Sequence, residues 1–356
     1  MKTGKYYSCM KDFFKENTNN SEKIFILIAE YTEFNFEDLK NYNGEISGGI
    51  VPFVIYNNEF YNKGIIACSL NENSDFMLLE DLNKINDNSS FFENRNSFFV
   101  LLDGMSLNIT NFLENLFEKV SSNAQIIGGG AGKITFNNDP VIFSKEKIYT
   151  NAAIIIASTK ILHTKIGSGW EYLAGPFLST ISDKNIIKTL NFKKSFDVYT
   201  EVVEKDCGIK FTDDNFFDIA KSYPLGITKF DNQIIMRDLI SIDEQNHMVL
   251  VSDVPQNATI NILKGEKPNL IKSSGNAVKE LLDEINSDKK QDVLLFNCIA
   301  RAIYLGDSFT DELNEIKSHM KDNATLFGAL TLGEIANNRD EYISYYNKSC
   351  IVGSLC

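Results

Sequence analysis

The sequence predicts an α/β protein made of two mixed α/β domains, and three observations support this fold class. β-like apolar runs alternate with helical segments along the whole chain. The chain has 356 residues, whereas a single hydrophobic core stops growing near about 250–300 residues. A glycine-containing segment also recurs three times, which predicts an internally repeated unit of strand, crossover, glycine loop and hairpin.

The three segments align when Gly48, Gly128 and Gly328 share a column. They read GGIVPFVIYNNEFY, GGGAGKITFNNDPV and GALTLGEIANNRDE, and an Asn-Asn pair follows the first glycine at the same spacing in each. Asn suits a hairpin tip because its side chain tolerates positive φ and bonds to nearby backbone. A β-like run lies on both sides of each segment, so we expect all three glycines at strand ends that enter a hairpin.

The first domain is expected over residues 23–194, after a polar leader over residues 1–22. Buried strands are predicted where apolar residues run together, at Ile24–Ala29, Gly64–Leu70, Phe98–Leu102, Ala152–Ala157 and Leu173–Ile181. Asn35 is a suitable N-cap for a short helix over residues 35–42. Ser106 likewise predicts the start of a helix, whose apolar stripe from Phe112 to Val120 has the spacing of one helix face.

The second domain is expected over residues 195–356. Its first half is predicted to form two helices and three short strands, at Phe196–Val203, Asn215–Lys221, Gln233–Arg237, Met248–Ser252 and Ala258–Leu263. Pro268 suits the first turn of a long amphipathic helix. Val293–Phe296 is a further buried strand, and Thr310–Met320 is predicted to be a helix that leads to the third glycine segment.

Composition and charge exclude several classes of function. The net charge is −13, and 35 basic residues are scattered among 48 acidic ones, so a nucleic-acid partner is not expected. No apolar run approaches the length of about 18 residues that a membrane span needs, and the N-terminus has no signal-peptide core. Six cysteines without a CxxC pair suit reduced thiols, which predicts a cytoplasmic protein.

Local motifs for metal and phosphate binding are incomplete. Three histidines share no ligand spacing, so neither a metal nor another cofactor is expected. Gly128, Gly129 and Gly130 precede Lys133, but a phosphate loop would need glycine at position 127 and Ser or Thr at position 134. Isoleucine occupies both positions. A glycine turn that lets backbones pack closely is the favoured interpretation.

Four other residues are candidate site residues. Cys298 ends a predicted buried strand and Arg301 follows three residues later, at the strand edge where α/β proteins place ligands. An arginine can lower the pKa of a thiol, although no histidine is near in sequence. Trp170 follows Gly169 in a turn-like segment, and Glu334 follows Gly333 between apolar neighbours. Core packing for the tryptophan and a surface position for the glutamate are the alternatives.

The order of motifs resembles the FIST family, which pairs a FIST N-terminal with a FIST C-terminal domain. The C-terminal landmarks are Phe296-Asn297-Cys298-Ile299-Ala300-Arg301, Gly328-Ala329-Leu330-Thr331-Leu332-Gly333-Glu334-Ile335 and Tyr346-Asn347-Lys348-Ser349. Upstream landmarks are Ile127-Gly128-Gly129-Gly130-Ala131-Gly132, Gly169-Trp170-Glu171, Phe196-Asp197-Val198-Tyr199, Tyr223-Pro224-Leu225-Gly226 and Arg237-Asp238. Ser168 and Ala300 depart from the family pattern, which has histidine and glycine there.

The resemblance implies a sensory protein of signal transduction that binds a small molecule, possibly an amino acid, and has no established catalytic activity. Arg301 or Arg237 would hold a carboxylate, Glu334 an ammonium, and Trp170 would supply an apolar wall. Gly128, Gly129, Gly130, Cys298, Gly333 and Asn347 complete the expected ligand site. A separate signalling output protein would receive the signal. The alternatives are a thiol enzyme that uses Cys298 and an interaction scaffold without a small ligand.

Overall fold

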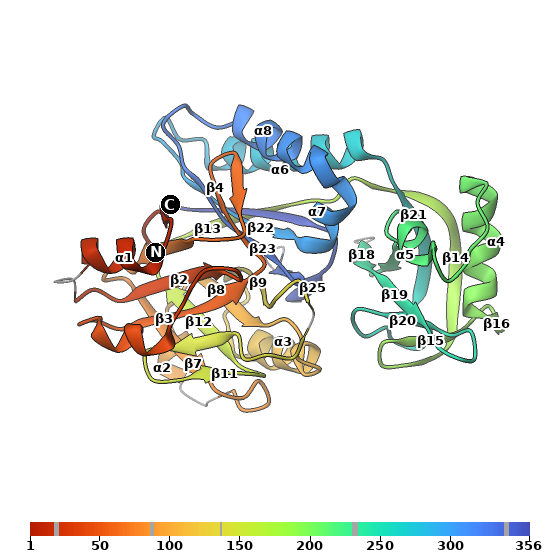
Figure 1. Ribbon diagram of the computed structural model, residues 1–356, viewed down its shortest axis with the longest axis horizontal. Helices are drawn as coiled ribbons and strands as arrows, with labels where there is room; N and C mark the ends of the chain where they lie inside the picture. The colour runs from red at the N-terminus through yellow and green to blue at the C-terminus, as the bar shows by residue number, and fades with distance from the viewer. Residues whose placement is uncertain (18–20, 86–88, 136, 230–233, 338–341) are drawn as a thin grey trace.

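The computed structural model describes residues 1–17, 21–85, 89–135, 137–229, 234–337 and 342–356. They form a body of three six-stranded sheets and a lobe with a fourth sheet, with helices on the outer faces (Figure 1). The predicted α/β class is confirmed, because mixed parallel and antiparallel sheets alternate with helices along the chain.

The three sheets of the body share one strand order. The first contains, in spatial order, β1 (Lys5–Tyr7), β6 (Ile65–Ser69), β2 (Ile24–Ala29), β3 (Ile46–Val51), β10 (Ile142–Ser144) and β11 (Ile148–Tyr149). The second contains β7 (Ser74–Leu79), β12 (Ala153–Ser158), β8 (Ser97–Asp103), β9 (Gln125–Ala131), β24 (Glu334–Ala336) and β25 (Ser344–Tyr346). The third contains β13 (Leu162–Gly167), β26 (Cys350–Leu355), β22 (Val293–Cys298), β23 (Leu326–Thr331), β4 (Phe53–Tyr56) and β5 (Glu59–Tyr61).

Each sheet is built around one parallel pair, β2 with β3, β8 with β9, and β22 with β23. The two strands that end each sheet come from another part of the chain. The pair β4–β5 follows β3 but joins β23, β10–β11 follows β9 but joins β3, and β24–β25 follows β23 but joins β9. No sheet is therefore complete without a neighbour, and the body packs as one unit.

Helices cover the outer face of each sheet, while a shared apolar core fills the space between the sheets. The first sheet carries α1 (Met10–Asn17) and the 3-10 helix η1 (Phe36–Asn41), and the second α2 (Ser89–Phe92) and α3 (Ile109–Lys119). The third carries α6 (Lys267–Ile285), α7 (Ile299–Leu305), η2 (Gly306–Ser308) and α8 (Phe309–Ser318). The parallel strands are buried on both faces, which explains their nearly continuous apolar sequences.

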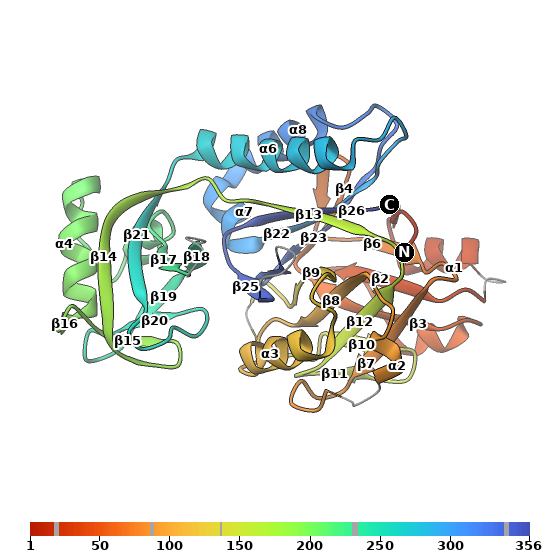
Figure 2. The same cartoon turned by 180° about the vertical axis from the view of Figure 1, so that it is seen from behind.

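The lobe consists of residues 170–265 and stands to one side of the body (Figures 1 and 2). Its strands are β14 (Trp170–Asp183), β15 (Ile186–Leu190), β16 (Lys193–Lys194), β17 (Leu225–Thr228), β18 (Ile234–Arg237), β19 (Leu239–Ile242), β20 (Met248–Leu250) and β21 (Thr259–Gly265). Helices α4 (Ser195–Cys207) and α5 (Phe216–Ala220) pack with this sheet around a separate core. The domain boundary expected after residue 194 lies inside this lobe, between β16 and α4.

The expected position at a strand end is wrong for all three aligned glycines. Gly48, Gly128 and Gly328 lie inside strands, opposite Ile26, Val100 and Leu295 of the parallel partner. In each case an added Cβ would press on the carbonyl oxygen of that partner residue, so the close approach of two strands excludes a side chain. The three aligned glycines therefore occupy corresponding positions in the three parallel strand pairs.

The Asn-Asn pairs differ among the three segments. Asn57 has a φ of 55° at the tip of the β4–β5 hairpin. Asn137 and Asn138 lie in an irregular segment before β10, and Asn338 lies outside the described residues. Local helix signals were more accurate, because Asn35 does cap η1 by accepting a hydrogen bond from the Glu37 N–H.

No helix among the described residues is long and apolar enough to cross a membrane.

Candidate functional site

The candidate site lies where the carboxyl ends of β8, β9, β22 and β23 meet the lobe. The segment Tyr345–Ser349, which joins β25 to β26, runs across these strand ends and contacts both parts of the molecule. Lys348 adopts a φ of 54° within it. This is the edge at which open α/β sheets place their ligands.

Glu334 is fully buried at the start of β24 and has only neutral partners. Its carboxyl accepts hydrogen bonds from the hydroxyls of Thr331 at 3.2 Å and Ser349 at 2.6 Å, and the Cys298 thiol also bonds to it. Burial raises the pKa of Glu334 to about 8, because no cation among the described residues compensates the loss of water. At neutral pH the group is therefore mostly a neutral acid.

Cys298 ends β22, and its N–H donates to the carbonyl oxygen of Ser349 at 3.1 Å. Burial and the nearby Glu334 raise the pKa of the Cys298 thiol well above its usual range. The histidines are elsewhere, since His163, His247 and His319 pair with Glu284, Asp243 and Glu315. A thiol in these surroundings stays protonated, which opposes its use as a nucleophile.

Arg301 lies on α7, and other protein groups already occupy its guanidinium. Nε lies 3.1 Å and 3.2 Å from the two carboxylate oxygens of Glu312 on α8. Nη2 donates to the carbonyl oxygen of Leu270 at 2.6 Å and to the Ser274 hydroxyl at 3.0 Å, and Nη1 donates to the carbonyl oxygen of Ser168 at 2.5 Å. Both charged side chains are fully buried, so this pair ties α6, α7 and α8 together.

Arg237, at the end of β18, is also buried but has a different set of partners. Nη1 donates to the carbonyl oxygens of Met236 and Tyr345, both at 3.0 Å, and to Oδ1 of Asn347 at 3.3 Å. Nε donates to the carbonyl oxygen of Asp253 at 3.3 Å. Among the described residues no carboxylate forms an ion pair with Arg237 and none bonds to Nη2. Burial lowers its pKa to about 10.

Lys348 forms the second buried contact between body and lobe. Its ammonium lies 2.8 Å from Oδ1 of Asp238 and donates to the carbonyl oxygen of Lys221 at 3.0 Å. The same ammonium lies 5.0 Å from the centre of the Trp170 ring, whose Nε1–H donates to the carbonyl oxygen of Lys348 at 2.9 Å. One face of the tryptophan is therefore occupied by a protein cation.

The glycines expected in the site serve close packing. Gly129 faces the Thr331 side chain, and the Tyr345 ring packs against Gly130 and Gly333. The Gly130 N–H donates to the carbonyl oxygen of Gly333 at 2.9 Å, and Gly333 has a φ of 114°. Gly128, Gly129 and Gly130 are residues of β9, so the expected loop is a buried strand that presents no amide cradle to an anion.

The structure thus brings together Cys298, Glu334, Arg237, Asn347 and Trp170 around the Tyr345–Ser349 segment. Arg301 lies outside this group and is connected to the segment by a hydrogen bond from Nη1 to the carbonyl oxygen of Lys348. Sequence reasoning missed Lys348, Asp238 and Tyr345 as site residues, although two of them stand next to residues that it named. Within the described part of the chain, no group of three His, Cys, Asp or Glu side chains is placed to hold a metal ion.

Two family comparisons match this chain over consecutive ranges. The FIST N domain matches residues 36–193, and the FIST C domain matches residues 195–337. A comparison with curated proteins finds no match. FIST domains are sensory domains of signal transduction, and the two matches together cover most of the 356 residues. The chain belongs to the FIST family.

Proposed function

We propose that this sensory protein binds a small zwitterion of the amino-acid type where the lobe meets the body. The observation that carries the proposal is the state of Arg237, a buried arginine that has no carboxylate partner among the described residues. A buried cation without an anion is costly, so such residues are typically paired. A ligand carboxylate on Nη2 would supply the missing charge through charge-assisted hydrogen bonds.

Glu334 is the proposed partner of the ligand ammonium. It belongs to the same cluster, because the Tyr345 hydroxyl lies within electrostatic range of both Glu334 and Arg237. Its pKa of about 8 reflects burial without a cation. A ligand ammonium beside Glu334 would lower this pKa and favour the charged carboxylate. Asn347 already orients Arg237 and would remain its neighbour.

The position of this site suggests how ligand binding would change the arrangement of lobe and body. Arg237 and Asp238 belong to the lobe, whereas Tyr345, Asn347 and Lys348 belong to the body. A ligand that changes these contacts would shift the balance between two lobe positions, as hinge closure does in other binding proteins. A separate output protein in the cytoplasm would read that shift. The six free cysteines are consistent with a reducing compartment.

A thermal-shift screen of the twenty amino acids tests this proposal on the full chain. A ligand at 100 times its dissociation constant stabilises a fold by about 2.7 kcal/mol, which corresponds to roughly 5–10 °C here. Arg237→Gln should abolish that shift, because glutamine keeps hydrogen bonding but removes the cation. Arg95→Gln is the matched control, since Arg95 precedes β8 at the surface and, among the described residues, bonds only to the carbonyl oxygen of Asn73.

Two outcomes of the screen would reject the zwitterion. No shift with any amino acid would favour the interaction scaffold without a small ligand. A shift that survives in Arg237→Gln would show that the ligand binds elsewhere. Arg301 is unsuitable for this test, because its removal would leave the buried Glu312 carboxylate without its cation and destabilise the fold itself.

A further inference from the structure

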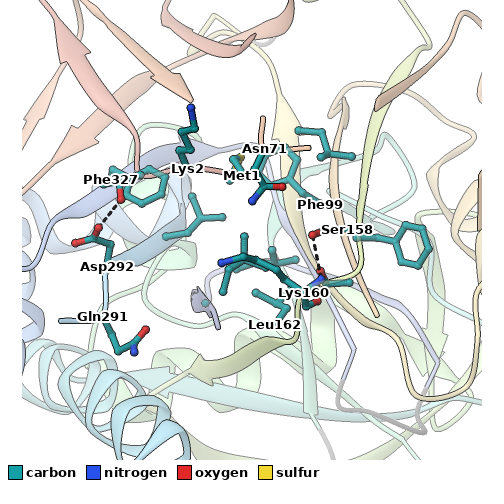
Figure 3. A pocket seen from close by; sticks show the side chains of 18 of the residues that line it. Met1, Lys2, Asn71, Phe99, Ser158, Lys160, Leu162, Gln291, Asp292 and Phe327 are labelled. Carbon is teal, nitrogen blue, oxygen red and sulfur yellow. Dashed lines mark hydrogen bonds between the residues drawn. The ribbon is translucent and has the colours of Figure 1, made fainter. Parts of the chain in front are cut away.

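The amino ends of the same parallel strands enclose a cavity that the proposed site does not use. Its volume is about 340 Å³, within the range of small-molecule sites. Residues of β8, β9, β12, β13, β22, β23 and β26 line it, and residues 1–3 lie across one side (Figure 3). Leu294 lines the cavity and Cys298 belongs to the opposite site, so they lie four residue steps apart along β22, about 13 Å of strand.

The floor of this cavity is apolar. It is formed by side chains of the core shared by the three sheets, among them Phe99, Ile156, Leu162, Leu294 and Phe327. These residues come from different sheets and leave a space that none of them fills. An apolar space of this kind favours a hydrocarbon or aromatic group, because burial removes the group from water.

The rim carries positive charge, although the protein as a whole has a net charge of −13. Lys2, Lys160 and Lys290 line the cavity, and Asp292 is the one acid among its lining residues. Lys2 pairs with Glu22 at 2.8 Å, and Lys290 pairs with Asp292 at 3.2 Å. Asp292 also accepts a hydrogen bond from the Thr325 N–H at 2.7 Å, so internal partners take up its charge.

Lys160 is the cation of the rim that has no partner. Its ammonium makes neither an ion pair nor a hydrogen bond with any described residue, and the side chain extends across the cavity in Figure 3. Its backbone is held from both sides, since its N–H donates to the Ser158 hydroxyl at 3.2 Å and its carbonyl oxygen accepts from the Ser97 hydroxyl at 3.0 Å. These two bonds hold the backbone from which the side chain extends.

A second unused donor lies beside the cavity. Gln125 pairs with Ser97 across β8 and β9, and both Ser97 and Ile127 line the space. The Gln125 Nε2 group is buried and has no hydrogen-bond partner among the residues that the structure describes, although Oε1 accepts from the Thr164 hydroxyl at 3.1 Å. A buried amide donor without an acceptor is uncommon in folded proteins.

From these observations we infer that the cavity is a binding site for a small amphiphilic carboxylate. The apolar body of the ligand would occupy the floor made by Phe99, Leu294 and Phe327. The carboxylate would lie at the rim, where it would accept a hydrogen bond from the Lys160 ammonium. A free amino acid fits this site poorly, because its ammonium would face lysines. The site is therefore independent of the zwitterion site at the lobe.

Calorimetric titration of the full chain with octanoate tests the inference, with octylamine and 1-octanol as matched ligands. Octanoate should bind saturably at one site, and octylamine, which places a cation on the lysine rim, should not. Lys160→Met should weaken octanoate binding at least tenfold, because one charge-assisted contact is lost. Lys272→Met is the control, because Lys272 is an exposed residue of α6 outside the lining.

A second variant blocks the space instead of the charge. Leu162→Phe should fill part of the cavity and weaken octanoate binding, with circular dichroism melting as the check that the variant folds. Arg237→Gln should leave octanoate binding unchanged, which separates this test from that of the zwitterion. Octanoate that does not saturate, equal binding of all three ligands, or full affinity in Lys160→Met would each overturn the assignment.

Discussion

The two ends of the parallel strand pairs differ in almost every property that matters for binding. At the carboxyl ends, charged groups are buried and nearly all of them have partners, as the Arg301–Glu312 and Lys348–Asp238 pairs show. At the amino ends, an apolar floor opens to a rim where the Lys160 ammonium is unpaired within the described structure. At the carboxyl ends, protein groups bind one another, whereas at the amino ends they leave an open cavity.

This difference arises from what covers each end of the strands. The lobe and the Tyr345–Ser349 segment cover the carboxyl ends, so any charge there must find a partner or raise the free energy of the fold. At the amino ends, residues 1–3 and short connections, among them residues 290–292, lie beside the strand residues that line the cavity. The three sheets share one strand order, but the two ends of their strands present different surfaces. The reason is that the lobe and the chain connections differ between the two ends.

The largest expected effect concerns the buried pair at the carboxyl end. Arg301→Met should lower the free energy of unfolding by about 3–5 kcal/mol, because Glu312 would remain buried without its cation. Urea unfolding measures the loss. Arg301→Met combined with Glu312→Leu should recover part of it, and a single variant as stable as the natural protein would contradict the structural role given to Arg301.

The next effect concerns the close approach inside a parallel pair. Gly128→Ala should cost about 3 kcal/mol, because the new Cβ would press on the carbonyl oxygen of Val100 and force β8 and β9 apart. Gly208→Ala is the control. Its added Cβ meets nothing within 4 Å, and its φ of 72° alone should cost only about 1 kcal/mol. Equal losses in the two variants would refute the steric explanation.

A smaller effect should appear as a dependence of stability on pH. The pKa of Glu334 rises from 4.5 in the unfolded chain to about 8 in the folded protein. The folded state therefore keeps a proton that the unfolded chain releases, and stability should fall as pH rises from about 4.5 to about 8. Glu334→Gln, which mimics the neutral acid, should be less sensitive to pH over that window in urea unfolding.

Asp103 acts in the same direction, because burial also raises its pKa. The slope in Glu334→Gln should therefore shrink without vanishing. An unchanged slope would mean that Glu334 titrates near its usual pKa and is less isolated from water than its contacts indicate.

The smallest expected effect is an absence of labelling at the buried thiols. Iodoacetamide at neutral pH should modify Cys356, which is exposed, and leave Cys298 unmodified, because burial keeps the Cys298 thiol protonated and inaccessible. Peptide mass spectrometry separates the two sites. Faster modification of Cys298 than of Cys356 would revive the thiol enzyme that uses Cys298.

Local sequence signals predicted individual elements well. The apolar run Phe98–Leu102 lies within β8, and Pro268 is in the first turn of α6. The helix predicted from Ser106 begins three residues later at Ile109, because the Ser106 hydroxyl accepts from the Asn108 N–H in a turn that precedes the helix. The glycine segment around Gly128 was predicted as a loop, because glycine at a strand interior is normally unfavourable and only a close partner strand explains it.

The sequence by itself determined the α/β class and the family, because apolar periodicity and motif order are local properties of a chain. Only the tertiary structure decided which arginine pairs with a carboxylate. Arg301 and Arg237 look alike in the sequence, but Glu312 neutralises the first and no described carboxylate pairs with the second. The lysine-rimmed cavity was equally invisible, because its lining residues are distant in sequence and their charges act together only after the sheets have packed.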